Sequence, residues 1–259
     1  MQFSLSDKSI LITGGTQGLG AAVAEEAAAQ EAARIAIAGR NREKGEKVAD
    51  KLSEYGTAVR FFEADLSDIE IQTRLVGEVV DWAGGVDGLV NCAGRTDRAS
   101  FVDGTPDQWN ALFSLNAQAP FFLMQAFIRH RLQAGGNGSV VNILSMNAHC
   151  GHPDLAIYSA TKGALSTLTK NAANAHLSDG IRVNGINMGW APTDAEIDMQ
   201  ANVLGNGDGW LEEAEQSAPL GRLLTPAEVA RLCIYLLSDY SGLQTGTLVD
   251  LEQHVVGAP

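Results

Sequence analysis

The sequence predicts an α/β fold, in which a doubly wound parallel β-sheet is covered by helices on both faces. Short, nearly continuous apolar segments alternate with longer amphipathic segments along the whole chain. A glycine-rich turn at residues 13–20 joins the first apolar segment to the first amphipathic one. No Pro/Ser-rich stretch or long charge run interrupts the 259 residues, so we expect a single domain, residues 1–259.

Seven apolar segments have the length and composition of buried strands. Because most of their residues are apolar, each strand is expected to be covered on both sides, as the strands of parallel sheets are. The expected strands are residues 9–13, 34–38, 58–63, 86–91, 139–144, 181–187 and 247–251.

Helices are expected where the longer amphipathic segments lie. A last helix begins at Thr225-Pro226-Ala227-Glu228, which provides a threonine cap and a proline at the first helical position. An insert at residues 189–221 is expected to be rich in loops and poor in helix. The other expected helices are residues 18–30, 42–55, 69–82, 105–131 with a break, and 157–177.

The composition argues against several functional classes. The net charge of −13 disfavours nucleic acid as a partner, because binding phosphate backbones needs concentrated Lys and Arg. Three cysteines without CxxC spacing (Cys92, Cys150 and Cys233) fit a reducing compartment and indicate neither disulfides nor a zinc site. The five histidines form no HxxxH or HExxH pattern, so no metal is expected.

No leader or membrane span is expected. The first residues run directly into the first apolar segment, without the pattern of a signal peptide. No stretch approaches the ~20 uninterrupted apolar residues that a membrane-crossing helix needs. We therefore expect a cytoplasmic protein that acts on a small molecule and binds neither nucleic acid nor a membrane.

The glycine-rich turn has the features of a dinucleotide site. Ligands of doubly wound sheets bind beyond the carboxyl ends of the strands. Glycine lets the backbone turn sharply and approach a pyrophosphate at a helix N-terminus. A glycine turn alone is weak evidence, but this one follows a strand and opens a helix, as dinucleotide binding requires. The residues expected to bind the cofactor here are Gly14, Thr16, Gln17, Gly18, Leu19 and Gly20.

The end of the second strand distinguishes two cofactors. A free ribose 2′-hydroxyl calls for an acidic residue about twenty residues after the turn. The strand instead runs into Arg40, Asn41 and Arg42, with no acid at its tip. Arg40 can hold a 2′-phosphate through paired charge-assisted hydrogen bonds, and Asn41 adds a donor. We therefore expect NADP, with NAD as the alternative if the arginines are only solvated surface residues.

Tyr158 and Lys162 are four residues apart, so both side chains project from one face of the expected helix. A phenol normally titrates near a pKa of ~10. An ammonium beside it favours the phenolate and lowers that pKa toward the working range. Ser145 lies thirteen positions before the tyrosine. A YxxxK pair occurs by chance in many proteins, but together with the glycine turn it indicates proton transfer beside a dinucleotide.

Taken in order, these motifs resemble those of the short-chain dehydrogenase/reductase family over essentially the whole chain. The resemblance implies a Rossmann-like fold and an NADP-preferring oxidoreductase. Two departures are visible: Cys92 stands where the family has a second asparagine, and Met188 stands where it has a proline before Gly189. The landmarks that match are residues 13–20, Asp65-Leu66, Asn91-Cys92-Ala93-Gly94, Asn116, Ser145, Tyr158, Lys162 and Asn187-Met188-Gly189.

By this resemblance, four residues form a catalytic tetrad. Tyr158 would exchange a proton with the substrate oxygen, which Ser145 would also bind. Lys162 would lower the tyrosine pKa and bond the nicotinamide ribose, and Asn116 would hold a water that links Lys162 to solvent. Each could alone be an ordinary structural residue; all four at the family spacing favour catalysis. The resemblance implies further cofactor contacts from Asp65, Leu66, Asn91, Ala93, Gly94, Gly189 and Thr193.

The insert at residues 189–221 is implied by the resemblance to close the substrate pocket. Its apolar residues, Trp190 among them, and its many acidic residues would repel anions and suit a sugar, a polyol or a small neutral ketone. His149 and His152 lie between Ser145 and Tyr158 in the sequence, so we expect both to border the pocket.

Two alternatives remain open. One is reduction of 3-oxoacyl groups on an acidic carrier protein, for which Arg129-His130-Arg131 is a candidate docking patch. The other is a non-catalytic NADPH sensor, although such proteins commonly lack the tyrosine or the lysine. The resemblance also implies a homotetramer or homodimer, paired through the helices near residues 116–131 and 157–177.

Overall fold

The computed structural model describes residues 3–207 and 209–256 of the chain. Within these residues seven strands form one sheet in the order β3-β2-β1-β4-β5-β6-β7, and every neighbouring pair is parallel. The predicted doubly wound sheet is therefore confirmed. The strands are β1 Ser9–Thr13, β2 Arg34–Gly39, β3 Ala58–Glu63, β4 Gly88–Asn91, β5 Gly138–Ser145, β6 Ile181–Met188 and β7 Leu248–Leu251.

The strand order reverses between β1 and β4. Ile12 of β1 pairs with Ile37 of β2 on one side and with Val90 of β4 on the other. From β1 the chain builds outward to β3, and from β4 it builds in the opposite direction to β7. The loops that follow β1 and β4 consequently diverge at the carboxyl edge, which is where a doubly wound sheet binds its ligand.

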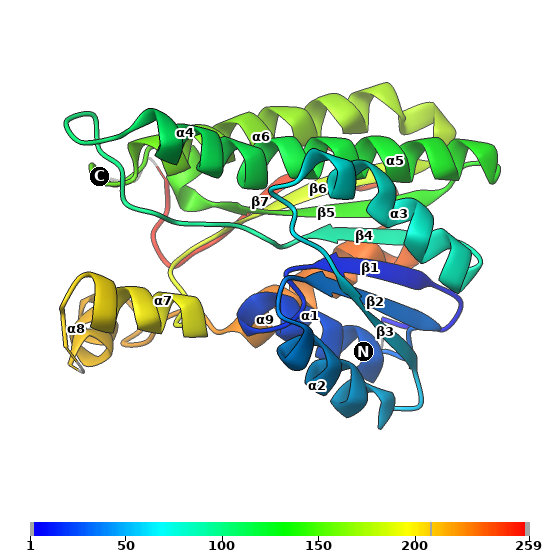
Figure 1. Cartoon of the computed structure of the whole chain (residues 1–259), viewed down its shortest axis with the longest axis horizontal. Coiled ribbons are helices and arrows are strands. Elements are labelled where there is room, and N and C mark those ends of the chain that lie inside the picture. The colour runs from blue at the N-terminus through cyan, green and yellow to red at the C-terminus, as the bar shows by residue number, and fades with distance from the viewer. Residues whose placement is uncertain (1–2, 208, 257–259) are drawn as a thin grey trace.

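Helices cover both faces of the sheet (Figure 1). On one face, small and branched side chains such as Val23 and Ile234 pack into one core cluster, and on the other face Leu75 and Phe127 belong to a second. Burial of these apolar surfaces is the main force that holds the layers together. The helices of the first face are α1 Gly18–Ala29, α2 Arg42–Ser53 and α9 Pro226–Leu237, and those of the second are α3 Ile69–Ala83, α5 Ala119–Gln133 and α6 Ala156–Ala175.

The expected break in the helix at residues 105–131 is present. Helix α4, Pro106–Phe113, passes through a π-helical turn, Ser114–Gln118, into α5. Pro120 at the start of α5 has no N–H to donate, which favours such an irregular turn. By length and composition Pro106–Gln133 could cross a membrane, but half of its most apolar window is buried inside the fold, as in a core helix.

The insert differs from its prediction, because it contains two short helices. They are α7, Asp194–Asp198, which a π-helical turn extends, and α8, Trp210–Ser217. Trp210 is buried, with its ring 5.7 Å from that of Trp190. Helices of five and eight residues are too short to show a clear apolar period, and the glycines between them pointed to loop. We call residues 189–221 the lid; Figure 1 shows it beyond the carboxyl ends of the strands.

Candidate active site

A cavity of about 860 Å³ lies at the carboxyl edge of the sheet, between the strand ends and the lid. It contains the glycine-rich turn at one end and Ser145, Tyr158 and Lys162 at the other. Of the residues predicted for the cofactor, the substrate and catalysis, all but three line this cavity. The three that do not are Asn91, Asn116 and His149.

The glycine-rich turn forms a cradle that only glycines permit. A Cβ atom at Gly20 would lie 2.2 Å from the carbonyl oxygen of Gly14. Gly14 itself has a φ of +67°, and a Cβ there would lie 3.0 Å from the backbone of Ala93. No side chain caps the following helix, α1, so its first N–H groups are free of side-chain partners. An exposed helix N-terminus above a glycine cradle fits a pyrophosphate.

At the end of β2, the three polar side chains after Gly39 make different contacts. Arg42 is bound to Glu63, 2.6 Å away. The Asn41 side-chain oxygen caps α2 by accepting from the Lys44 N–H at 2.9 Å. The Arg40 guanidinium lines the cavity and, within the described part of the chain, has no hydrogen-bond or ion-pair partner. Arg40 is therefore the residue that can hold a 2′-phosphate, while Asn41 mainly shapes the turn.

A second cation, Lys44, lies beside this end of the cavity without lining it, and sequence reasoning did not select it. The Lys44 ammonium donates to the side-chain oxygen of Gln17 at 2.7 Å, so it reaches the glycine-rich turn from α2. Asp65 also lines the cavity; hydrogen bonds from Ser67 lower its pKa, with a smaller contribution from Arg40. These contacts fit the adenosine half of a dinucleotide.

Asn91, predicted to contact the cofactor, does not line the cavity. Its side-chain nitrogen donates to Asn142 on the neighbouring strand at 2.8 Å, and the residue is buried in the sheet. The turn after β4 is instead fixed by Thr13, whose hydroxyl accepts from the N–H groups of Cys92 and Ala93 at 3.0 and 3.2 Å. Cys92 is partly buried and lines the cavity, and burial raises the pKa of its thiol to about 12.

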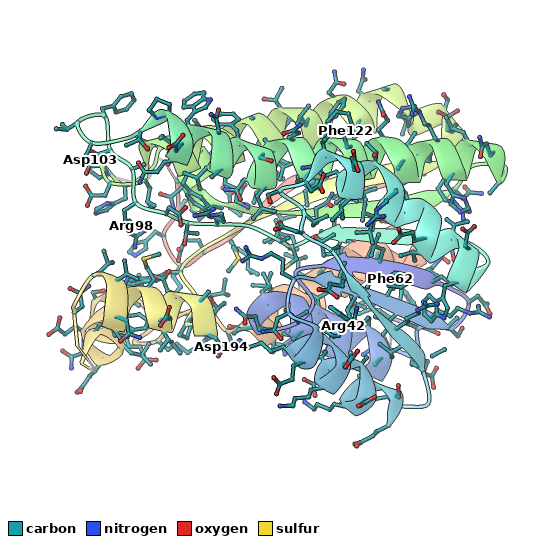
Figure 2. All side chains as sticks on the ribbon, in the orientation of Figure 1. Arg42, Phe62, Arg98, Asp103, Phe122 and Asp194 are labelled. Carbon is teal, nitrogen blue, oxygen red and sulfur yellow. The ribbon has the colours of Figure 1, made fainter. Side chains whose placement is uncertain are left out.

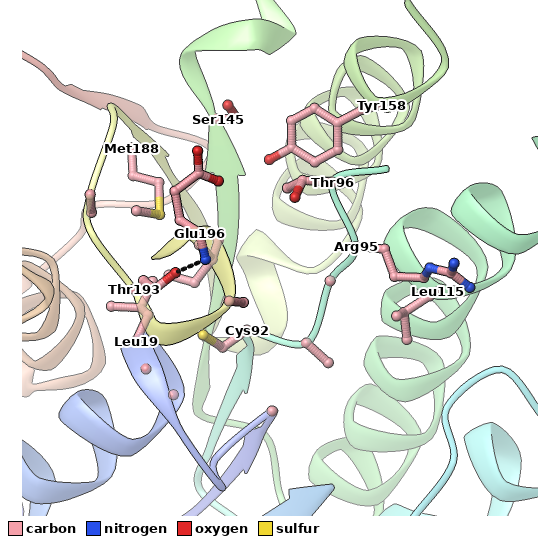
Figure 3. A pocket seen from close by; sticks show the side chains of 18 of the residues that line it. Leu19, Cys92, Arg95, Thr96, Leu115, Ser145, Tyr158, Met188, Thr193 and Glu196 are labelled. Atoms are coloured by element: carbon pink, nitrogen blue, oxygen red, sulfur yellow. Dashed lines mark hydrogen bonds between the residues drawn. The ribbon is translucent and has the colours of Figure 1, made fainter. Parts of the chain in front are cut away.

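Ser145, Tyr158 and Lys162 converge in the cavity from β5 and α6 (Figure 3 labels the first two). The Ser145 hydroxyl oxygen accepts from the backbone and side-chain nitrogens of Asn147, both at 3.2 Å. The Lys162 ammonium donates to the carbonyl of Ile143 at 2.7 Å and lies 5.7 Å from the centroid of the Tyr158 ring. The predicted grouping on one helical face is thus present.

The expected effect of Lys162 on the tyrosine is absent from this arrangement. Burial raises the pKa of Tyr158 to about 12, and the Ser145 hydroxyl opposes that rise. Burial also lowers the pKa of Lys162 to about 8. Burial thus opposes the lowering of the tyrosine pKa that was predicted from Lys162. The prediction neglected that desolvation acts on both groups.

Asn116 lies behind the cavity rather than in it. Its side-chain nitrogen donates to the Arg95 carbonyl at 2.9 Å and to the Thr161 hydroxyl at 3.1 Å, and its oxygen accepts from the Arg95 N–H at 2.9 Å. The π-helical turn directs this side chain inward. In this structure Asn116 connects the loop after β4 to α6, next to Tyr158 and Lys162.

Of the two histidines predicted to border the pocket, only one does so. His152 lines the cavity. His149 turns away: its Nε2 atom lies 3.0 Å from an Asp250 carboxylate oxygen, which also accepts from Asn187 at 2.7 Å. A negative partner on β7 therefore holds His149 outside the pocket, which spacing along the sequence could not show.

The lid completes the cavity with residues that the sequence identified only in part. Thr193 caps α7 and lies over the glycine-rich turn: its Cβ would be 3.4 Å from a Cβ at Gly18. Glu196, one of the acidic lid residues expected to repel anions, also lines the cavity, as does Arg98, which sequence reasoning did not select. In the described ranges no three His, Cys, Asp or Glu residues are grouped as metal ligands would be.

Comparison with known proteins agrees with this geometry. Residues 14–252 match the family model described as enoyl-(acyl carrier protein) reductase. The NADP-dependent (R)-specific alcohol dehydrogenase of Lentilactobacillus kefiri is 33% identical, over 93% of this chain and 94% of that protein. The 3-oxoacyl-(acyl-carrier-protein) reductase FabG of Chlamydia pneumoniae is 31% identical, over 96% and 97%. L-Sorbose reductase from Gluconobacter frateurii, solved with NADPH and L-sorbose, is 27% identical over the full length of both chains, with a TM-score of 0.93.

Proposed function

The chain belongs to the short-chain dehydrogenase/reductase family, and we propose that it is an NADP-dependent oxidoreductase that interconverts a carbonyl and a secondary alcohol by hydride transfer. The observation that carries this proposal is one cavity that contains both the glycine cradle and the Ser145, Tyr158 and Lys162 side chains. A non-catalytic NADPH sensor would not need the Ser145, Tyr158 and Lys162 side chains, so we do not favour that alternative.

Tyr158 is the general acid of the proposed reduction. Because burial raises its pKa to about 12, it keeps its proton at neutral pH and can give it to the substrate oxygen. The Ser145 oxygen already accepts two hydrogen bonds from Asn147, so the remaining capacity of its hydroxyl is to donate to that same substrate oxygen. NADP, when bound, supplies the hydride chemistry.

Lys162 has a fixed position beneath this acid. One of its three N–H groups is used by the Ile143 carbonyl at 2.7 Å, which leaves two for other acceptors. We assign these to the ribose hydroxyls of the cofactor and to proton exchange with Tyr158. Asn116 keeps the loop at Arg95 against α6 and so holds the floor of the site in place.

The preference for NADP over NAD rests on Arg40. It is the cation at the end of β2 that lines the cavity without a partner in the described structure, and Lys44 lies nearby at Gln17. The L. kefiri relative is NADP-dependent, and the sorbose reductase was solved with NADPH. NAD remains the alternative cofactor for the case that Arg40 is only a solvated surface residue.

For the substrate we propose a sugar, a polyol or a small neutral ketone. The lid covers the catalytic end of the cavity with the aromatic ring of Trp190 and the carboxylate of Glu196. A mixed apolar and acidic wall repels anions, and its carboxylate can accept hydrogen bonds from substrate hydroxyl groups. The similarity to L-sorbose reductase along the full chain supports the same class.

Reduction of 3-oxoacyl groups on a carrier protein is the second candidate, supported by the similarity to FabG. The expected docking patch at Arg129-His130-Arg131 does not fit it well. Arg131 is bound to Asp87 at 2.9 Å, and His130 accepts from the Val86 N–H at 3.2 Å. Both contacts lie at the amino end of β4, away from the cavity, so they favour a structural role for Arg131 and His130.

We further propose a homotetramer or homodimer in the cytoplasm. Phe121 and Leu132 on α5 are 40% and 44% exposed, and Trp109 on α4 is 48% exposed. These apolar side chains would be covered if the helices paired with a second copy. Gel filtration with light scattering measures the assembly size directly.

The proposed function is tested by following NADPH with two groups of compounds. Sugars and neutral ketones, which should oxidise NADPH, form the first group together with polyols, which should reduce NADP⁺; an acetoacetyl thioester, followed by NADPH oxidation, represents the carrier-linked substrate. Turnover of the first group at tenfold or more above the thioester is the expected result. The reverse order would favour the second candidate, and tight NADPH binding without turnover of any compound would contradict both.

A further inference from the structure

Two opposite charges face each other at the catalytic end of the cavity. Glu196 lies on α7 of the lid, and Arg98 lies in the loop between β4 and α4. The Glu196 Oε1 atom is 4.0 Å from a terminal guanidinium nitrogen of Arg98, and both residues line the cavity. Figure 2 shows Arg98 extending from its loop toward the lid. Neither residue belongs to the tetrad or to the dinucleotide cradle.

The Glu196 carboxylate is held in place by hydrogen bonds to only one of its two oxygens. Its Oε1 atom accepts from the Trp190 indole at 2.9 Å and from the Gln200 amide at 2.7 Å. Its Oε2 atom has no hydrogen-bond partner among the described residues, although the side chain is only 14% exposed. Figure 3 shows this carboxylate directed toward the hydroxyls of Tyr158 and Ser145. A carboxylate oxygen that lines a cavity without a protein donor is suited to a ligand that brings one.

Both charges lie within electrostatic range of the reacting hydroxyl. Burial is the largest influence on the Tyr158 pKa, and among the charged neighbours Glu196 raises that pKa while Arg98 lowers it. The third charged group beside the ring is Lys162, on its own helix. A substrate whose oxygen contacts Tyr158 therefore extends its neighbouring carbon atoms toward Glu196 and Arg98.

We propose that Glu196 and Arg98 are specificity-determining residues that bind hydroxyl groups next to the reacting carbon. This inference rests on the proposed function and names the chemical feature that its substrates share. Glu196 accepts a hydrogen bond from one hydroxyl, and Arg98 donates one to the same or the adjacent hydroxyl. A hydroxyl both donates and accepts, so it satisfies the two charges together, whereas an alkyl chain would desolvate them without compensation.

The test compares two ketones with the same four-carbon skeleton, erythrulose and 2-butanone, which differ only in their hydroxyl groups. With NADPH, the wild-type protein is expected to have the higher kcat/KM for erythrulose. In Glu196→Gln and in Arg98→Gln, the ratio of the two kcat/KM values should fall by ~10-fold or more, because each loses a charge-assisted hydrogen bond. Thermal unfolding of each variant checks that the fold is retained.

Asp194→Asn provides the matched control. Asp194 begins the same short helix and its substitution removes the same charge, but it is exposed and does not line the cavity. Its ratio should stay within about twofold of wild type. A comparable fall in this control would show that lid charge in general, and not the Glu196 position, sets the preference, and would overturn the inference.

Two further outcomes separate this inference from the proposed function. If the Glu196 and Arg98 variants change both ketones by the same factor, or change neither, the inference is overturned while the proposed reaction stands. If wild-type protein reduces no carbonyl compound, the proposed function fails instead. Calorimetric binding of erythrulose with NADP⁺ present then decides: binding ~10-fold weaker in Glu196→Gln supports the assignment, and equal or absent binding refutes it.

Discussion

The Lys162 ammonium lies beneath the ring of Tyr158, 5.7 Å from its centroid, and donates to the Ile143 carbonyl at 2.7 Å. Both side chains are largely buried, and burial moves their pKa values toward their neutral forms. The tyrosine is therefore protonated at neutral pH, as the proposed general acid of the reduction must be.

Replacing Tyr158 with phenylalanine should lower kcat by ~10²-fold or more, because general acid catalysis typically contributes that much. The ring and its packing against Lys162 are retained, so the NADPH dissociation constant should change by less than about threefold. Steady-state kinetics and a fluorescence titration measure the two quantities. A variant that kept a tenth of the wild-type rate would remove Tyr158 from the mechanism.

Reduction and oxidation should depend on pH in opposite directions. Burial lowers the pKa of Lys162 to about 8, so above that pH the ammonium that orders the site is lost and the kcat for reduction should fall. Burial raises the pKa of Tyr158 to about 12, so the phenolate that accepts a proton becomes more abundant as the pH rises, and oxidation should accelerate between pH 7 and 10. Rates measured in both directions from pH 6 to 10 check this; a reduction rate that stays level through pH 10 would contradict the lysine assignment.

Arg40→Ala should weaken NADPH binding by ~10- to 100-fold and leave NADH binding nearly unchanged, because only the phosphorylated cofactor loses an ion pair. Arg42→Ala is the matched control. Arg42 is already paired with Glu63 at 2.6 Å, so its loss should change NADPH binding by less than about threefold. Titration with both cofactors measures these effects, and an equal loss for NADPH and NADH in Arg40→Ala would argue against 2′-phosphate recognition.

The N-terminal cap of α9 should make a measurable contribution to stability. The Thr225 hydroxyl oxygen accepts from the Glu228 N–H at 3.3 Å, and the Glu228 carboxylate accepts from the Thr225 N–H at 2.9 Å. Thr225→Ala is expected to lower the free energy of unfolding by about 1 kcal/mol. The control is Thr73→Ala, since Thr73 is exposed and bonds only to carbonyls of its own helix. Chemical denaturation that gave the same change for both would contradict the capping role.

Tertiary packing decided which polar residues enter the site. Asn91, Asn116 and His149 were all expected at or beside it, and all three instead bond to neighbouring elements. An asparagine at a strand end can point along the strand or into the sheet, and the choice depends on Asn142, which lies 51 residues away. Spacing along the chain contains no information about such a partner.

The structure of the lid also could not be predicted from spacing along the sequence. Its two short helices depend on a local cap at Thr193 and on the contact between Trp190 and Trp210, and neither has a periodic signal in the sequence. Glu196 was expected only as one of several acidic lid residues and Arg98 was not selected, because nothing in the sequence places a lid carboxylate opposite a loop arginine 98 residues before it. Their 4.0 Å approach exists only once the lid has folded over the cavity.

The sequence by itself determined the seven parallel strands, the glycine cradle and the Tyr158–Lys162 face, because each follows from local patterns: apolar runs, backbone freedom and a four-residue helical spacing. The tertiary structure alone decided the pKa direction at Tyr158, the partners of the buried asparagines and the charges that face the substrate. Those properties depend on burial and on contacts between distant segments, and both arise only when the layers pack.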